Sequence, residues 1–176
     1  MSPRLKILCF CIASFLLVGC DQVTKRIVED HLIEGVSTSY LNDTFRLIYV
    51  RNTGAALNLG DELPPAASFW LLSAIPLLIL IGLTIYVFKN IQTISPSRAF
   101  AFCLIVAGGI GNIIDRIAFD RHVTDFLNVG IGGFRTGIFN LADVCVTIGA
   151  VVLLLSSLRK RKAIRGSIDS VGRQSL

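Results

Sequence analysis

The chain has 176 residues, of which 53% are hydrophobic and only 16% are charged, and its mean hydropathy is +0.69. These values are typical of a membrane protein with several spans and exclude an ordinary soluble domain of this length. The net charge of +5 is explained by basic residues that flank apolar stretches and contact anionic membrane phospholipids, so nucleic acid is not an expected partner.

Four apolar stretches predict four transmembrane helices within a single membrane domain, 1–176. The expected spans are about 5–23, 66–88, 99–117 and 138–158, each near the ~20 residues that cross a bilayer. Basic residues lie before the first span, between the second and third, and in the tail 159–176, whereas the loops at about 24–65 and 118–137 hold most acids. The positive-inside rule therefore predicts cytoplasmic termini and outward-facing acidic loops. From about Gly166 the tail is expected to be polar and disordered.

The first span ends in Asp21-Gln22-Val23-Thr24-Lys25. Lys25 can either pair with Asp21, four residues earlier on the same helix face, or extend toward lipid headgroups. Just before this motif, Leu17-Val18-Gly19-Cys20 is a lipobox-like sequence, so the start of the chain also mimics a lipoprotein signal. Cleavage there would leave an odd number of spans, which conflicts with the basic tail. We therefore expect the segment to be retained, and modification of Cys20 stays an open question.

The first outer loop contains a strand signal. Phe45-Arg46-Leu47-Ile48-Tyr49-Val50-Arg51 is rich in β-branched and aromatic residues, a composition that favours a β-strand. It leads into Asn52-Thr53-Gly54-Ala55-Ala56, a turn-like break in which Gly54 is available for a positive φ. A small sheet lying on the membrane beside the mouth of the helix bundle is expected.

The third span ends in Gly108-Gly109-Ile110-Gly111-Asn112-Ile113-Ile114-Asp115-Arg116. Ala107 and Gly111 form a small-xxx-small pattern that lets a neighbouring helix approach closely. Asp115 and Arg116 are predicted to form a local ion pair that organises the site. Three asparagines are better explained as hydrogen-bond partners of the substrate or of carboxylates than as structural polar groups; these are Asn52, Asn112 and Asn140.

Two carboxylates carry the chemistry that the sequence predicts. Asp143 would be the sixth residue of the fourth span, and an ionisable group in hydrocarbon costs ~2.5–3.5 kcal/mol, so it is usually kept for function or pairing. Asn140, three residues earlier, is expected to share its helix face. Asp125 lies in the polar segment just before this span, close enough to meet Asp143 at the outer surface. Two adjacent carboxylates that share one proton are the basis of an aspartyl active site.

Intramembrane carboxylates also mark ion routes, so a small transporter or proton pathway is the alternative function. No acid or histidine lies in the cytoplasmic half of a predicted span, so a proton relay would lack an inner exit. The chain has two histidines, His31 and His122, and no HExxH pair. No metal and no cofactor are therefore expected.

Five motifs in this order resemble the lipoprotein signal peptidases (signal peptidase II, prolipoprotein signal peptidase), a family of bacterial membrane aspartyl proteases. The resemblance covers Asp21 to about Gly149. Its motifs are Asp21…Lys25, Asn52-Thr53-Gly54-Ala55-Ala56, Gly108-Gly109-Ile110-Gly111-Asn112…Asp115-Arg116, Val123-Thr124-Asp125-Phe126 and Phe139-Asn140-Leu141-Ala142-Asp143. Leu57 departs from the phenylalanine that the family commonly has there, which alters apolar lining and leaves the chemistry unchanged.

The resemblance implies an all-α polytopic membrane protein with four transmembrane helices and a small β-cradle on the outer, periplasmic surface of the bacterial inner membrane. It implies a catalytic dyad of Asp125 and Asp143. The residues that would bind substrate or support the site are Asp21, Lys25, Asn52, Gly54, Gly108, Asn112, Asp115, Arg116, Asn140 and Ala142. Substrates would be prolipoproteins cut before a diacylglyceryl-modified lipobox cysteine, and the cyclic peptide globomycin would inhibit the enzyme. The signal helix of the substrate is expected to pack near Gly108 and Gly111.

Overall fold

A computed structural model describes residues 1–55 and 59–174, with side chains described as far as Arg159. Ala56 and Leu57 of the turn motif therefore lie outside the described residues. The elements, in chain order, are α1 (Pro3–His31), β1 (Ser37–Tyr40), β2 (Phe45–Asn52), α2 (Pro65–Phe69), η2 (Trp70–Ala74), α3 (Ile75–Asn90), α4 (Pro96–Ala118), β3 (Val123–Ile131), β4 (Phe134–Arg135) and α5 (Leu141–Gln174).

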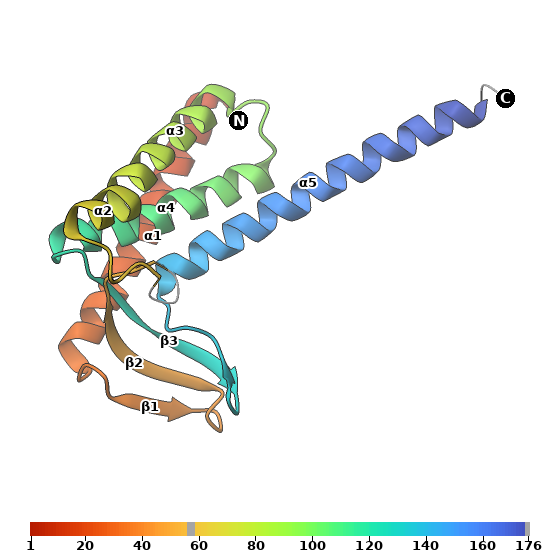
Figure 1. The fold of residues 1–176 in the computed structure, drawn as a ribbon. Coiled ribbons are helices and arrows are strands. Elements are labelled where there is room, and N and C mark those ends of the chain that lie inside the picture. Colours follow the sequence, from red (N-terminus) through yellow and green to blue (C-terminus); the bar gives the residue numbers. More distant parts are fainter. Residues whose placement is uncertain (56–58, 175–176) are drawn as a thin grey trace.

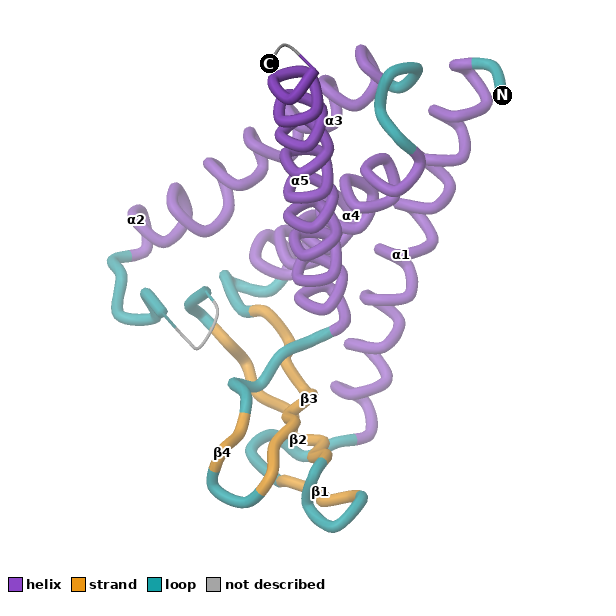
Figure 2. The backbone as a smooth tube through the Cα atoms, turned by 90° about the vertical axis from the view of Figure 1, so that its right-hand side faces the viewer, coloured by secondary structure: helices purple, strands orange, loops and turns teal. Residues whose placement is uncertain are grey.

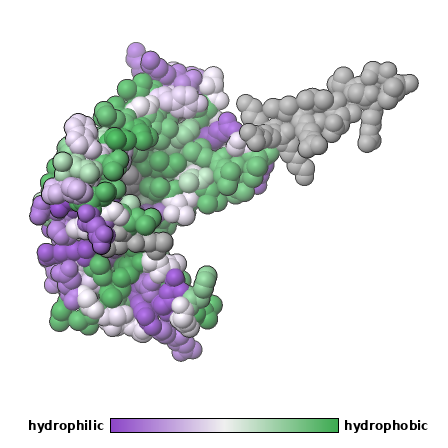
Figure 3. Space-filling model, viewed as in Figure 1, coloured by the Kyte–Doolittle hydropathy of each residue, from purple (hydrophilic) through white to green (hydrophobic). Residues whose placement is uncertain are grey.

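Four helical segments among the described residues are long and apolar enough to cross a membrane. They are Pro3–His31, Pro65–Asn90, Pro96–Ala118 and Leu141–Arg159. Figure 1 shows the helices gathered together and a small sheet at one end of them. Figure 3 shows an apolar surface over the helices and a mixed polar and apolar surface over the sheet. The prediction of four transmembrane helices with a small sheet is confirmed.

Helix α1 continues past the expected end of the first span. Its start is fixed by the Ser2 side chain, which accepts a hydrogen bond from the Leu5 N–H at 3.3 Å, as a capping residue does. Its outer turns extend to His31 because Val28 is buried against Tyr49 and Phe126 of the sheet. Packing against another element, rather than lipid, therefore stabilises this end of the helix.

The second span is one continuous helical segment with a π-helical turn, η2, near its start, between α2 and α3. The turn lies directly before Pro76, which has no N–H to donate and whose ring crowds the preceding turn. A π-helical turn is a recognised way to absorb such an irregularity without breaking the helix. The span thus passes its internal proline intact.

The sheet is antiparallel with the order β1-β2-β3-β4. Strand β2 confirms the strand predicted at Phe45–Arg51. Strands β3 and β4 fall in residues 118–137, which were expected to be a loop. The signal in Val123–Ile131 is its content of β-branched and aromatic residues, which the polar Asp125 and Asn128 obscure. Asp125 consequently sits on a strand that pairs with β2.

Helix α4 lies at the centre of the bundle, in contact with α1, α3 and α5. A Cβ on Gly108 would overlap the carbonyl oxygen of Ala142 on α5, and a Cβ on Gly111 would lie 2.5 Å from an Asp21 carboxylate oxygen on α1. The small residues of α4 thus allow close helix packing, as predicted. The chain's own helices cover Gly108 and Gly111, so the expectation that a substrate helix packs there is wrong.

The last helix is longer than expected. Helix α5 continues to Gln174, as Figures 1 and 2 show, so the expected disordered end from Gly166 is contradicted. No proline follows Leu141 in the chain, and nothing in the backbone chemistry stops the helix.

Candidate active site

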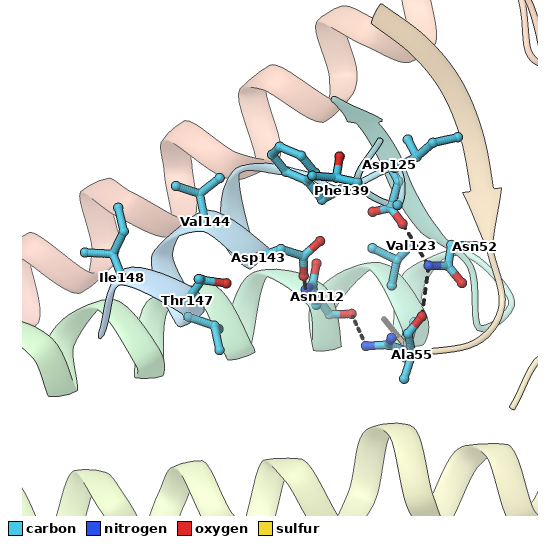
Figure 4. Close-up of a pocket in the computed structure, with 15 residues that line it drawn as sticks. Asn52, Ala55, Asn112, Val123, Asp125, Phe139, Asp143, Val144, Thr147 and Ile148 are labelled. Carbon is cyan, nitrogen blue, oxygen red and sulfur yellow. Dashed lines mark hydrogen bonds between the residues drawn. The ribbon is translucent and has the colours of Figure 1, made fainter. Parts of the chain in front are cut away.

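The two predicted carboxylates face one cavity. Asp125 from β3 and Asp143 from α5 line a cavity of about 630 Å³, together with Asn52, Asn112 and Arg116. Figure 4 shows Asp125 and Asn52 toward one end of the cavity, Asp143 and Asn112 between the ends, and Val144, Thr147 and Ile148 along the other end. The cavity therefore combines a polar end with an apolar wall supplied by α5.

Asn140 links the two carboxylates. It is fully buried and donates hydrogen bonds from its side-chain nitrogen to Asp125 Oδ1 at 2.6 Å and to Asn112 Oδ1 at 3.0 Å. Its Oδ1 accepts the Asp143 N–H at 3.0 Å, and Asp143 Oδ2 accepts the Asn140 N–H at 3.1 Å. This reciprocal pair is a capping box at the start of α5. Asn140 therefore precedes the helix, and the expectation that it shares a helix face with Asp143 is wrong.

The start of α5 also changes the position of Asp143. Because the helix begins at Leu141, Asp143 lies in its first turn, nearer the helix end than the sixth residue of a span. The positive end of the helix dipole stabilises a negative charge there. Asn112 adds a hydrogen bond from its side-chain nitrogen to Asp143 Oδ1 at 2.8 Å. Asp143 is thus surrounded by groups that suit a carboxylate anion.

Asp125 has a different environment. It is only 2% exposed. Its pKa is raised to about 6, chiefly by burial and also by the nearby charge of Asp143, while the hydrogen bonds from Asn52 and Asn140 and the charge of Lys25 limit the rise. Asn52 donates to Asp125 Oδ2 at 2.8 Å. The two residues come together because Asp125 pairs with Val50, two residues before Asn52 on β2, and residues two apart share a sheet face.

A buried ion network of Lys25, Asp21 and Asp115 fixes the orientation of the Asn112 side chain. Lys25 Nζ lies 2.8 Å from Asp21 Oδ2 and 2.8 Å from Asp115 Oδ2, and none of the three side chains is more than 3% exposed. Lys25 also donates to Asn112 Oδ1 at 3.0 Å. Of the two open alternatives for Lys25, the structure has the pairing with Asp21. Because Lys25 and Asn140 both donate to the Asn112 oxygen, the Asn112 nitrogen is directed at Asp143.

Asp115 and Arg116 do not form the predicted ion pair. Successive residues on a helix point in directions about 100° apart, so Asp115 faces Lys25 while Arg116 faces the cavity. Arg116 Nη2 donates to the Gly54 carbonyl at 2.9 Å. Its Nε is buried and has no hydrogen-bond partner among the described residues. Arg116 therefore holds the turn after β2 and keeps one donor available.

Two further expected residues act through their backbone. Gly54 has no positive φ, unlike Gly35, Gly60 and Gly132, so the expected left-handed turn is absent; its N–H donates to Asn52 Oδ1 at 2.9 Å. Ala142 is fully buried against α4, and its N–H donates to Asp21 Oδ1 at 2.9 Å.

Sequence reasoning missed Gln22 and Thr124. Gln22 donates to Asp115 Oδ1 at 2.7 Å and to the Gly111 carbonyl at 3.2 Å, and the Thr124 N–H donates to Asp115 Oδ2 at 3.3 Å. Both residues lie inside motifs beside an aspartate, which was the available signal. The partners named here lie on α4, whereas Gln22 lies on α1 and Thr124 on β3, so the sequence did not show what they contact.

This fold and this cavity define a multi-pass membrane protein with a pair of carboxylates held at one end of its helix bundle. Residues 13–159 match the family Peptidase_A8, signal peptidase (SPase) II. The chain is similar to the lipoprotein signal peptidase of Borrelia duttonii, at 36% identity over 81% of this chain and 85% of that protein. It is also similar to that of Treponema pallidum, at 32% identity over 86% and 84%. The chain therefore belongs to the signal peptidase II family.

Solved structures agree with this assignment. A bacterial membrane enzyme determined at 2.3 Å resolution is 30% identical and superposes with a TM-score of 0.74, over 86% of this chain and 88% of that chain. Another, determined at 1.9 Å, is 30% identical with a TM-score of 0.69, over 85% and 92%. The likeness therefore extends over most of both chains.

Proposed function

We propose that this protein removes signal peptides from prolipoproteins and that it does so as an aspartic peptidase with Asp125 and Asp143 as its dyad. Family membership supports the peptidase activity. The observation that carries the aspartic mechanism is the bridge through Asn140, which binds both carboxylates at the wall of one cavity. Two carboxylates held this way share a proton and can act as a base and an acid.

The surroundings of the two carboxylates favour different roles. Asp143 has the helix start and two N–H donors to stabilise its charge, so it serves as the base. Asp125, with its pKa raised to about 6 by burial, serves as the acid. Asp143 takes a proton from a bound water as the water oxygen attacks the scissile carbonyl, and Asp125 protonates the developing oxyanion. On collapse, Asp143 gives its proton to the leaving nitrogen and Asp125 regains one from the intermediate's hydroxyl, which restores the starting state.

The cavity suits a lipid-modified substrate. Next to the carboxylates it is lined by apolar side chains, namely Ile138, Phe139, Val144, Val146 and Ile148. An acyl chain gains ~0.8 kcal/mol for each CH₂ that it buries, so a diacylglyceryl group on the cysteine would hold the bond before it beside the dyad. The free Nε of Arg116 would donate to a substrate carbonyl. Globomycin, a cyclic peptide, would inhibit by filling this cavity.

We place the protein in the bacterial inner membrane with both termini cytoplasmic and the dyad toward the outer face. The charge distribution of the loops supports this orientation. Anionic phospholipids would contact the basic ends of the helices. The transporter alternative is not supported, because the relatives named above are peptidases and the buried charges lie at one end of the spans.

The test is to compare cleavage of one prolipoprotein with and without its diacylglyceryl group, by purified protein in the same detergent. We expect the lipidated form to be cut and the unmodified form to be cut far more slowly. Equal rates would refute lipid-guided recognition, and absence of cleavage of either form would refute the peptidase assignment.

A further inference from the structure

The free end of the sheet presents apolar side chains that have no core to enter. At this end the β1–β2 turn and the β3–β4 turn lie side by side, because the Gly130 N–H donates to the Thr44 carbonyl at 2.9 Å. Figure 1 shows both turns at the end of the sheet away from the helices. We call the exposed apolar residues of the two turns the apolar rim; they are Tyr40, Leu41, Val129, Ile131 and Phe134.

The rim is unusually exposed for such residues. Phe134 is 90% exposed, Ile131 is 81% exposed and Leu41 is 79% exposed. Scattered apolar residues on a surface need no explanation, but a group on adjacent turns indicates an interaction site. Leu41 also has a φ of 51°, a left-handed conformation that is unfavourable for leucine and that glycine or asparagine would adopt more easily. Contact with water does not offset the backbone strain of an exposed leucine, so burial of the Leu41 side chain against an apolar partner would be favourable.

A polar clamp behind the rim makes it rigid. Arg135 donates to the Asp43 carbonyl at 2.6 Å and to Asn128 Oδ1 at 2.6 Å, and Arg46 Nη2 lies 2.5 Å from Asp43 Oδ2. The hydrogen bond from Arg46 holds the pKa of the Asp43 carboxyl well below its usual range, so the clamp stays ionised near neutral pH. Two arginines against one aspartate leave a net positive charge just behind the apolar residues.

The rim is also kept close to the membrane. A short connection, residues 136–140, joins Arg135 at the rim to Leu141, the first residue of the membrane-spanning part of α5. Fully extended, this connection would separate the two residues by at most about 20 Å. This connection folds back on β3, with the Phe139 N–H donating to the Leu127 carbonyl at 2.9 Å, so its real reach is shorter. Figure 1 shows the sheet running across the direction of α1 rather than continuing it. The turns therefore extend sideways over the lipid beside the bundle.

We infer that the apolar rim inserts into the bilayer surface next to the helix bundle, with the acyl chains as its apolar partner and anionic headgroups facing the arginines of the clamp. Aromatic and aliphatic side chains with a basic neighbour are the combination that binds membrane interfaces. This contact anchors the outer end of β3, the strand that carries Asp125, relative to α5, which carries Asp143.

The test uses tryptophan as a depth probe. Trp70 is the only tryptophan of the chain, so the Trp70→Phe protein has no tryptophan fluorescence. Adding Phe134→Trp to it then gives a signal from the rim alone. The matched control is Ile33→Trp, because Ile33 is 75% exposed in the segment after α1 and lies outside the rim. Each protein is placed as a single copy in nanodiscs of phosphatidylcholine and phosphatidylglycerol, with or without bromine on the acyl chains near the headgroups.

We expect bromination to reduce the emission of Phe134→Trp strongly and to leave that of Ile33→Trp unchanged. The emission of Phe134→Trp should also be blue-shifted relative to the control. Unquenched emission from Phe134→Trp would overturn lipid insertion, and equal quenching of both probes would show that the rim has no special contact. The measurement reports lipid contact and not cleavage, so either result leaves the peptidase assignment to be judged by its own assay.

Discussion

Replacing Lys25 with methionine should destabilise the protein strongly. The ammonium group contacts two carboxylates, each at 2.8 Å, and all three side chains are almost completely buried. Methionine fills a similar volume but leaves Asp21 and Asp115 without their cation. Removal of one partner from a buried ion pair costs ~3–5 kcal/mol, because the remaining charge is left uncompensated. We expect the free energy of unfolding to fall by an amount in that range. The loss should not exceed it, because hydrogen bonds from Gln22, Thr124 and Ala142 still stabilise the two carboxylates.

Activity should fall by a separate route. Without Lys25, the Asn112 oxygen loses one of its two donors, and the amide is freer to turn its oxygen toward Asp143. Loss of a hydrogen bond to a charged group costs ~1.5–3 kcal/mol, which corresponds to a ~10- to 150-fold lower rate for the fraction that stays folded. This loss should appear in kcat, because Asn112 acts on Asp143.

The assay is unfolding by sodium dodecyl sulfate in mixed micelles, followed by Trp70 fluorescence, together with cleavage rates under folding conditions. The matched control is Arg26→Met, because Arg26 is the neighbouring cation but is 57% exposed in its pair with Glu29; an exposed pair of this kind contributes up to ~1 kcal/mol. Adding Asp115→Asn to Lys25→Met should restore part of the stability. A Lys25→Met protein as stable as the Arg26→Met protein would refute the role of the buried network.

Three further outcomes follow from the geometry. Gly108→Ala should destabilise the protein and lower activity, because the new Cβ would overlap the Ala142 carbonyl, whereas Gly82→Ala meets no atom within 4 Å and should be tolerated; unfolding of both variants checks this. If Asp125 is the acid, activity should decline as pH rises through about 6, and Asn52→Ala, which removes a hydrogen bond that lowers the Asp125 pKa, should move that decline to higher pH in a pH–rate profile. Cleavage should be insensitive to metal chelators; zinc-restored activity after chelation would contradict the dyad.

The sequence was sufficient for those parts of the structure that depend on local pattern. Hydropathy located the four spans, since a bilayer requires apolar helices of a set length. The composition of Phe45–Arg51 located strand β2. Asp125 and Asp143 were expected to meet, and they do line one cavity, because the turn before α5 returns the chain to β3.

The contacts of individual side chains could not be read in the same way. Asn140 was placed on a helix face by its spacing, but the helix begins one residue later and Asn140 caps it. Asp115 was paired with its sequence neighbour Arg116, although a helix turns adjacent residues apart, and its partner Lys25 comes from α1. Strand β3 was missed because two polar residues interrupt its apolar pattern: Asp125, which lines the cavity, and Asn128, which binds Arg135. In each case the deciding contact is with an element distant in the sequence.

The most direct test of the proposed mechanism is the cleavage of a lipidated prolipoprotein by Asp125→Asn and Asp143→Asn proteins. A carboxamide keeps the shape of each side chain but cannot cycle a proton, so we expect each substitution to lower the rate by at least ~100-fold. Insertion and unfolding should change little. Asp30→Asn, at an exposed acid on the outer part of α1, is the control and should keep full activity. Substantial cleavage by either dyad variant, in protein that is folded, would contradict the aspartic mechanism.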